Sequence, residues 1–215
     1  MLKENRQETM QPEDFREQTK ISDAQFQQFQ TYHKALLKWQ KAINLVSNTT
    51  LQSAWERHFW DSAQLVPYIP EQVKTIVDLG SGAGFPGMVL ALLFPDKNIH
   101  MIESDERKCQ FLKHVSRETN RPVSIHDDRI ENIIQNLTPD IITARAFSSL
   151  ENIIKMTKSV WQKNPALKML LLKGQKVEQE MAEARQLYAF DYEAHDSETH
   201  SEGCILKISN IKDAG

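Results

Sequence analysis

The sequence holds few glycines and almost no cysteine, and it has no long hydrophobic run. Its 215 residues include 7 glycines and 2 cysteines, Cys109 and Cys204, which are too few for a disulfide framework. The longest apolar run, residues 88–94, is too short to span a bilayer, and the first twenty residues lack the pattern of a signal or transit peptide. No Cys/His pair has the spacing of a zinc site. These absences favour a cytoplasmic protein with no metal site and no membrane partner.

Four of the seven glycines fall within the segment 78–87, DLGSGAGFPG, between a predicted strand and a predicted helix. Part of it matches the dinucleotide fingerprint G-x-G-x-x-G, which alone is a weak signal. Asp78, two residues before the first glycine, would repel a pyrophosphate but would suit a cationic amino-acid ligand. The alternation Asp-x-Gly-x-Gly-x-Gly is typical of S-adenosylmethionine methyltransferases. Glu103 ends the next predicted strand, where a carboxylate can accept both ribose hydroxyls of an adenosine.

Alternating strand and helix patterns extend from residue 73 to the end of the chain. We expect strands at 73–79, 98–103, 123–126, 140–145 and 167–173, with helices at 87–94, 105–119, 131–135, 150–162 and 175–188. Two further alternating stretches, 190–195 and 204–209, could pair as antiparallel strands. This order predicts an α/β fold, Rossmann-like, with a mostly parallel sheet and a C-terminal antiparallel strand pair.

The first seventy residues have a different character. Residues 1–20 are polar with little to bury, so we expect a disordered arm. Residues 21–70 predict an N-terminal helical subdomain, because the capping box Ser22-x-x-Gln25 precedes apolar residues at helical spacing. Residues 71–215 then form the domain that contains the glycine turn.

Several ordered motifs resemble the bacterial 16S rRNA (guanine-N7) methyltransferases, once called glucose-inhibited division protein B. These are Ile43-Asn44-Leu45, Arg57-His58-x-x-Asp61-Ser62, the glycine turn, Arg107-Lys108-x-x-Phe111-Leu112, Arg129-x-Glu131, Ala144-Arg145-Ala146-Phe147-x-Ser149-Leu150 and Lys173-Gly174. The resemblance covers about residues 44–176. It implies a class I methyltransferase fold and methylation of guanine 527 of 16S ribosomal RNA at N7, with S-adenosyl-L-methionine as cofactor.

The residues and the resemblance together give a candidate site. The predicted cofactor-binding residues are Asp78, Gly80, Gly82, Gly84, Phe85, Glu103, Ile130, Glu131 and Arg145, of which Gly80, Phe85, Ile130, Glu131 and Arg145 are implied by the resemblance. The predicted RNA-binding residues are Arg57, Arg107, Lys108, Arg145 and Lys173. We expect no metal ligands.

Guanine N7 carries a lone pair and no proton, so its methylation needs positioning rather than a general base. Arg145 and Lys173 end predicted strands at the edge where open parallel sheets bind ligands, and they are the candidates for positioning the substrate. Arg145 could instead brace a cofactor loop through Glu131, and Lys173 could be a solvated lysine. His58 fits a buried, hydrogen-bonded histidine better than a catalytic one.

The charge distribution bears on the partner. The net charge is −3, but residues 107–176 hold 13 Lys or Arg and 6 Asp or Glu, so that segment alone carries +7. Lys34, Lys38 and Lys41 form a further basic stripe, which fits either RNA contact or a solvated helix face. We therefore expect 16S rRNA in the small ribosomal subunit or its assembly intermediate as partner, bound by a monomer on a shaped surface rather than by charge alone.

Three other functions stay open at this point. The first is methyl transfer to another RNA, a small molecule or a protein. The second is a nicotinamide-dependent oxidoreductase, and the third is a non-catalytic RNA-binding or assembly factor. Binding of S-adenosylhomocysteine, rather than NADH, separates the oxidoreductase from the others.

Overall fold

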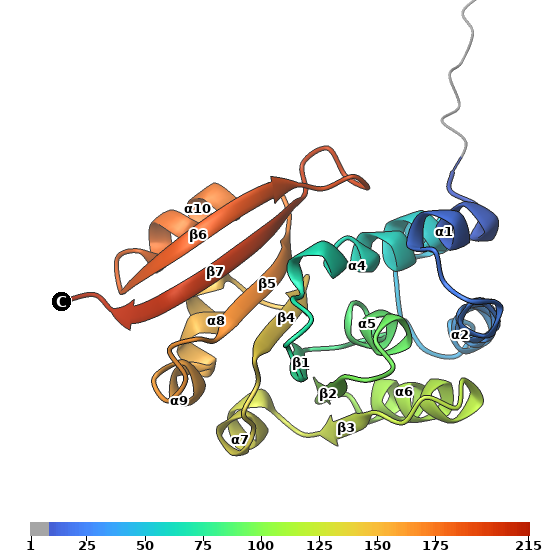
Figure 1. Ribbon diagram of the computed structural model, residues 1–215, viewed down its shortest axis with the longest axis horizontal. Helices are drawn as coiled ribbons and strands as arrows, with labels where there is room; N and C mark the ends of the chain where they lie inside the picture. The colour runs from blue at the N-terminus through green and yellow to red at the C-terminus, as the bar shows by residue number, and fades with distance from the viewer. Residues whose placement is uncertain (1–8) are drawn as a thin grey trace, which may run out of the picture.

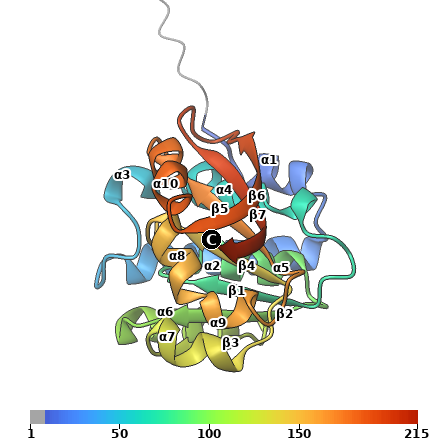
Figure 2. The ribbon, with the colours of Figure 1, turned by 90° about the vertical axis from the view of Figure 1, so that its left-hand side faces the viewer.

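A seven-stranded sheet with helices on both faces forms the centre of the computed structural model, which describes residues 9–215 (Figures 1 and 2). The strand order is β3-β2-β1-β4-β5-β7-β6. Strands β1 to β5 are parallel, whereas β7 is antiparallel to both β5 and β6. The strands are β1 (Thr75–Leu79), β2 (Asn98–Glu103), β3 (Ser124–Asp127), β4 (Ile141–Arg145), β5 (Lys168–Lys173), β6 (Tyr188–Asp196) and β7 (Cys204–Asp213). The predicted Rossmann-like α/β fold and its C-terminal antiparallel pair are confirmed.

The helices divide between two apolar clusters, one on each face of the sheet. One face carries α1 (Pro12–Thr19), α2 (Asp23–Trp39), α3 (Asn48–Leu51), η1 (Trp55–Trp60), α4 (Asp61–Ala63), η2 (Val66–Tyr68), α5 (Gly87–Leu93) and α6 (Glu106–Glu118). The other carries α7 (Ile130–Ile133), η3 (Ile134–Asn136), α8 (Leu150–Met156), α9 (Lys158–Trp161) and α10 (Val177–Ala184). Within residues 9–215, no helix combines the length and apolar character needed to cross a membrane.

The N-terminal arm differs from the prediction. Residues 1–8 lie outside the described part of the chain, but residues 12–19 form α1 instead of a disordered segment. The reason is Phe15, the one aromatic side chain of this polar stretch. It is fully buried, with its ring centroid 4.9 Å from that of Phe29 and 5.5 Å from that of Trp55. Burying a side chain of this size contributes about 2–3 kcal/mol toward holding the short helix on the core.

Helix α2 begins as predicted, with Ser22 accepting from the backbone of Gln25 and the Gln25 side chain accepting from Ser22. Its buried face packs on the loop that follows β1, where the Tyr32 hydroxyl donates to the carbonyl of Ala83. The regular elements within residues 21–70 are all helices, and their buried side chains share one apolar cluster with those of α5 and α6. The helical segment and the sheet support each other across the boundary at residue 70.

Asp78, in β1, holds the glycine turn from behind. Its side chain is completely buried; one carboxylate oxygen accepts from the backbone N–H of Gly87 at 3.2 Å and the other from the Thr143 hydroxyl at 2.8 Å. Burial raises the pKa of Asp78 to about 6, although these hydrogen bonds act in the opposite direction. The expected contact between Asp78 and a cationic ligand is thus corrected: both oxygens face the protein interior and brace the turn.

The first prediction concerns Phe15. Replacing Phe15 by alanine should lower the free energy of unfolding by about 3–4 kcal/mol, because a fully buried aromatic ring would leave a cavity between α1 and η1. Urea denaturation followed by circular dichroism measures this change. Glu17→Ala, on the exposed side of the same helix, is the control and should shift stability by less than about 0.5 kcal/mol. Equal and small effects of both substitutions would show that α1 contributes nothing to the core.

The second prediction uses the raised pKa of Asp78. Between pH 3.8 and about 6 the folded protein binds a proton at Asp78 that the unfolded chain has released, so wild-type stability falls as the pH rises through this window. Asp78→Asn keeps the shape and removes the titration. The free energy of unfolding of the variant, relative to wild type, should therefore rise by about 2.4 kcal/mol between pH 4 and pH 7. A difference that does not change with pH would contradict the burial effect.

Candidate functional site

A cavity of about 780 Å³ lies at the carboxyl ends of the parallel strands. Its walls come from the turn after β1 (80–85), the end of β2 (102–104), the loop before α7 (128–131) and the ends of β4 and β5 (145–147 and 172–174). Two segments outside these loops complete it. They are the N-terminal residues 45–61 and the β6–β7 loop with the residue after it (197–204). The cleft therefore depends on chain segments that are more than one hundred residues apart in sequence.

Three glycines of the turn have positive φ angles, 61° at Gly80, 55° at Gly82 and 92° at Gly84. At two of them a side chain would meet the protein: a Cβ at Gly80 would overlap the Phe147 ring, and one at Gly84 would lie 2.7 Å from the Tyr32 hydroxyl. At Gly82 the nearest atom, the Gly80 carbonyl oxygen, is 3.8 Å away. Gly82 is thus the turn residue that leaves open space in the cleft, whereas Gly84 lies behind it and does not line the cavity.

Glu103 lines the same part of the cleft and is 8% exposed. Its carboxylate links two chain segments: Oε2 accepts from the backbone N–H of Gly82 at 2.8 Å, and Oε1 accepts from that of Asp105 at 2.9 Å. A carboxylate oxygen has two lone pairs and can accept a second hydrogen bond in addition to the one seen here. Glu103 can therefore hold the turn in place and still accept from the hydroxyl groups of a ligand.

The other predicted cofactor residues lie around this end of the cleft. Ile130 is buried and Glu131 is exposed, and both line the cavity at the start of α7. Phe85 is 3% exposed and forms an apolar wall, with its ring 5.4 Å from that of Tyr32 and 5.0 Å from that of His58 between centroids. The structure thus brings Gly80, Gly82, Phe85, Glu103, Ile130, Glu131 and Arg145 to one cavity and leaves Asp78 and Gly84 behind it.

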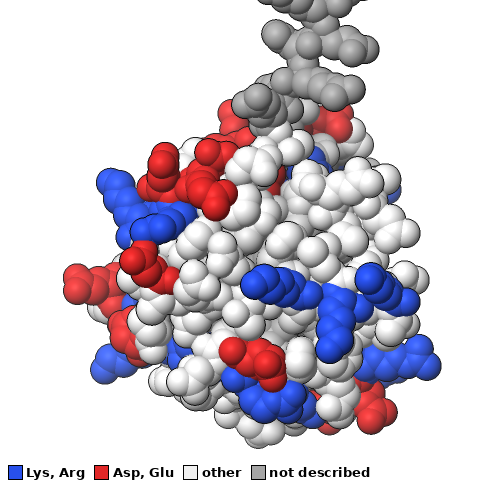
Figure 3. Space-filling model, turned by 90° about the vertical axis from the view of Figure 1, so that its right-hand side faces the viewer, with Lys and Arg blue, Asp and Glu red and all other residues white. Residues whose placement is uncertain are grey.

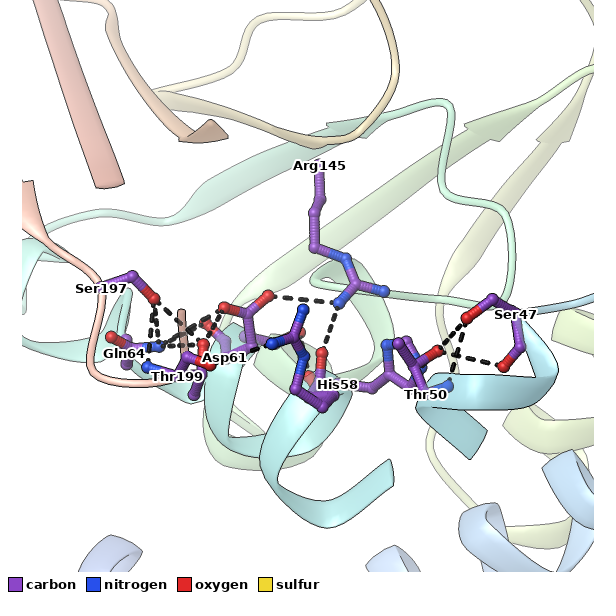
Figure 4. A network of polar contacts seen from close by, with 10 residues as sticks. Ser47, Thr50, His58, Asp61, Gln64, Arg145, Ser197 and Thr199 are labelled. Carbon is purple, nitrogen blue, oxygen red and sulfur yellow. Dashed lines mark hydrogen bonds and ion pairs between the residues drawn. The ribbon is translucent and has the colours of Figure 1, made fainter. Parts of the chain in front are cut away.

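Arg145, at the end of β4, points across the cleft toward the N-terminal helices (Figure 4). Its Nη1 donates to the Arg57 carbonyl at 3.0 Å and to a carboxylate oxygen of Asp61 at 3.2 Å, and its guanidinium carbon lies 5.0 Å from the centre of the Phe85 ring. The sequence analysis offers Glu131 as the acidic partner through which Arg145 could brace a loop, but in the structure the acidic partner is Asp61. The motif 57–62, which contains Asp61, is the sequence signal from which this ion pair could have been found.

Asp61 also connects the cleft to the β6–β7 loop, for which the sequence pattern predicts only a connection between two strands (Figure 4). Its second carboxylate oxygen accepts from the Thr199 hydroxyl at 2.6 Å. Arg57 donates to the Thr199 carbonyl at 3.2 Å, and the Gln64 side chain accepts from the backbone N–H of Glu198 at 2.7 Å. One carboxylate thereby joins the end of β4 to a loop that forms the opposite wall of the cleft.

His58 is buried as predicted, but only one of its ring nitrogens is paired. Its Nε2 lies 2.9 Å from the Thr50 hydroxyl oxygen, whereas Nδ1 has no hydrogen-bond partner within residues 9–215. Burial, and then the nearby positive charges of Arg145 and Arg57, lower the pKa of His58 to about 3. The imidazole therefore stays neutral near pH 7 and cannot act as a proton donor of imidazolium type there.

The remaining predicted RNA-binding residues fall in different places. The Lys173 ammonium is 8% exposed by side chain and is held by Glu180 and by the Ser148 carbonyl, both at 2.7 Å, so it ties the loop after β4 to α10. A solvated lysine is therefore excluded. Arg57 and Lys108 line the cleft, whereas Arg107 lines a neighbouring hollow instead.

The lining of the cleft combines two kinds of chemistry. Gly82, Glu103, Ile130 and Phe85 offer open backbone, a carboxylate and apolar side chains, a set that suits a nucleoside. Arg57 and Arg145 add guanidinium groups, and that of Arg145 lies 5.0 Å from the Phe85 ring. Such an arrangement can hold two molecules side by side and orient one toward the other.

Comparisons with known proteins agree with this geometry. The family model described as rRNA small subunit methyltransferase G matches residues 25–206. The protein named ribosomal RNA small subunit methyltransferase G from Parvibaculum lavamentivorans is 39% identical over 93% of this chain and 89% of its own length. The protein of the same name from Rickettsia felis is 41% identical over 86% of this chain and 93% of its own length.

Solved structures of methyltransferases share the fold at low identity. A Podospora anserina methyltransferase with bound S-adenosylhomocysteine has a TM-score of 0.58 at 12% identity, over 88% of both chains. The O-methyltransferase TomG from Streptomyces achromogenes, in complex with S-adenosylmethionine, has a TM-score of 0.56 at 12% identity, over 88% of this chain and 91% of its own. Together with the family match over most of the chain, the fold and the motifs lead to one conclusion: the chain belongs to the family of the ribosomal RNA small subunit methyltransferases G.

Proposed function

We propose that the cleft binds S-adenosyl-L-methionine and methylates a guanine of 16S ribosomal RNA at N7, the family target being guanine 527. Family membership supports methyl transfer to small-subunit RNA. The choice of guanine N7 follows from the motif resemblance and from the chemistry of the cleft. The protein acts in the cytoplasm, as a monomer, on the small subunit or on its assembly intermediate. A monomer suffices because one chain supplies every wall of the cleft described above.

The observation that carries the proposal is the open space at Gly82. A Cβ at this position would stand in the cavity instead of meeting protein atoms, so the bare backbone leaves room for a ligand. Glu103 lies directly beside it and retains lone pairs for ribose hydroxyls, and Ile130 and Phe85 supply apolar contacts for an adenine ring and for the side chain that carries the sulfonium. These residues fit S-adenosyl-L-methionine in both shape and donor–acceptor character.

When bound, the cofactor supplies a sulfonium methyl group, which the N7 lone pair takes up as the carbon–sulfur bond breaks, leaving a thioether and a positive charge on the base. N7 bears no proton, so no side chain has to remove one. The reaction therefore requires no base from His58, which a lowered pKa keeps neutral near pH 7, or from Asp78, which is buried behind the glycine turn. The work of the chain is to orient the guanine and to exclude water.

Arg145 is the residue that we assign to the guanine. Only its Nη1 is engaged within residues 9–215, which leaves Nη2 and Nε to donate to O6 of the base or to a phosphate. A bare guanidinium would oppose the positive charge that develops on the methylated base. Asp61 offsets this effect, because its carboxylate lies 3.2 Å from Nη1 and neutralises the charge of the donor. Lys173 acts at a distance, by holding the loop after β4.

Two other activities predict different outcomes. A methyltransferase for another RNA or a small molecule would bind the same cofactor but would not label the small subunit. A nicotinamide-dependent oxidoreductase would bind NADH, and the carboxylate of Glu103, which lines the cavity beside Gly82, disfavours a pyrophosphate there. The family match also favours methyl transfer over both.

The third prediction tests the cofactor site. Wild-type protein should bind S-adenosylhomocysteine in isothermal titration calorimetry and should give no heat with NADH. Gly82→Val should abolish the binding, because the isopropyl group would fill the open space of the cleft. Absence of heat with S-adenosylhomocysteine and wild-type protein would refute the proposed cofactor.

A matched control separates this effect from backbone strain. Asn120 follows α6 with a φ of 50°, close to the 55° of Gly82, so Asn120→Val places the same β-branched side chain in the same strained conformation away from the cleft. The control should lose stability yet keep its affinity for S-adenosylhomocysteine. Retained binding in Gly82→Val would move the cofactor elsewhere.

The fourth prediction concerns Arg145. Arg145→Ala should lower kcat/KM for methyl transfer to undermethylated small subunits by about a hundredfold, because the base is no longer oriented. Asp61→Asn keeps the acceptor for Thr199 but removes the charge, so it should lower kcat while the subunit affinity changes little. Initial rates with radiolabelled S-adenosylmethionine measure both effects. Unchanged turnover in folded Arg145→Ala would leave Arg145 with a structural role only.

A further inference from the structure

A second hollow of about 440 Å³ lies next to the cleft, between the end of α2 and the start of α6. Lys41, Arg107 and Lys108 contribute its positive charges. Lys108 also lines the cleft, so the hollow continues directly from the rim of the proposed active site. Arg107 and Lys108 are among the predicted RNA-binding residues, but the function proposed above gives no role to the hollow itself or to the lysines of α2.

The basic stripe of α2 extends the hollow along the surface. Helices α2 and α6 pack side by side: the Trp39 ring lies 5.7 Å from that of Phe111 and 5.4 Å from that of His114. Lys34 and Lys38 are exposed on α2, with Lys41 just beyond its end. Figure 3 shows the side of the molecule that carries α1, α2 and α6, where Lys and Arg side chains gather in the middle of a largely uncharged face.

These cations have no acidic partners of their own. Within residues 9–215, no carboxylate oxygen lies within 4.0 Å of the side-chain nitrogens of Lys34, Lys38, Lys41, Arg107 or Lys108. By contrast, Lys113 and Arg117, further along α6, are paired with Asp127 and Glu118. Asp105, whose carboxylate accepts from the backbone N–H groups of Arg107 and Lys108, also lines the hollow. The five cations outnumber this one acid, so the surface keeps a positive excess that favours a polyanionic partner.

We propose that this surface, formed by Lys34, Lys38, Lys41, Arg107 and Lys108, docks the sugar–phosphate backbone of the RNA that flanks the target guanine. The inference rests on the proposed function, because the cleft at the rim of the hollow is where the guanine enters. Phosphate groups fit isolated lysine side chains, which act as point charges without base specificity. The cleft then selects the base, and the α2–α6 surface sets the path of the strand.

The test neutralises the part of this surface that is remote from the cleft. In the triple variant Lys34→Gln, Lys38→Gln, Lys41→Gln the helix propensity is preserved, because glutamine and lysine are nearly equal helix formers. Its Kd for small subunits, measured by filter binding, should rise by about tenfold or more. The slope of log K against log salt should become shallower by about 2, as expected when two or three phosphate contacts are lost. Affinity for S-adenosylhomocysteine should stay unchanged.

A matched control carries the same change in net charge at the end of the sheet where the parallel strands begin, opposite the cleft. Lys74 precedes β1, Lys163 follows α9, and Lys212 lies near the end of β7; all three are exposed and lack an acidic partner within residues 9–215. The triple variant Lys74→Gln, Lys163→Gln, Lys212→Gln should leave the Kd and the salt slope close to the wild-type values.

Either of two results would overturn the docking surface: an unchanged Kd in the α2 variant, or an equal loss in the control. Failure of the proposed function gives a different pattern, since wild-type protein would then transfer no methyl group to the subunit. The binding assay does not require turnover, so each result can be assigned.

Discussion

The ion pair between Arg145 and Asp61 is the interaction on which the site depends. Arg145 ends a central strand, Asp61 lies in the N-terminal helices, and the same carboxylate accepts from Thr199 in the β6–β7 loop. The pair is largely shielded from water, with side-chain exposures of 17% and 15%. In such surroundings, removing one partner leaves the other charge poorly solvated, at a cost of several kcal/mol. Three distant segments are thus held around one cleft, and the guanidinium keeps free donors without carrying an uncompensated charge.

The surroundings of this pair divide the work of the cleft. Behind the glycine turn, Asp78 and Tyr32 hold the backbone, and neither reaches the cavity. In front of it, Gly82 and Glu103 offer open backbone and carboxylate lone pairs. The residues behind the turn set its shape, and those that line the cavity are left to bind. The chemistry proposed for guanine N7 requires this kind of preorganisation and no proton transfer.

Local patterns predicted the fold well, and the site only in part. The strands from β1 to β5 were predicted within two residues at each end, since strand–helix alternation and the glycine turn are encoded locally. Contacts between residues distant in sequence could not be predicted from local patterns: Asp61 lies 84 residues from Arg145 and 138 from Thr199. The polar composition of residues 1–20 wrongly predicted disorder where α1 forms. The helix is anchored by the buried ring of Phe15, and composition does not reveal which side chains become buried. Asp78 was recognised as important, yet its direction, inward, depends on the packing of β1 against β4.

The most direct measurement of the central claim is the position of the transferred methyl group. Small subunits from cells that lack this protein would be incubated with it and with methyl-labelled S-adenosylmethionine, beside naked 16S rRNA, and the labelled nucleoside would be identified and mapped. The account predicts 7-methylguanosine at a single nucleotide, guanine 527. Label in another base, in a ribose or at many sites would contradict it, as would the absence of any label in both substrates.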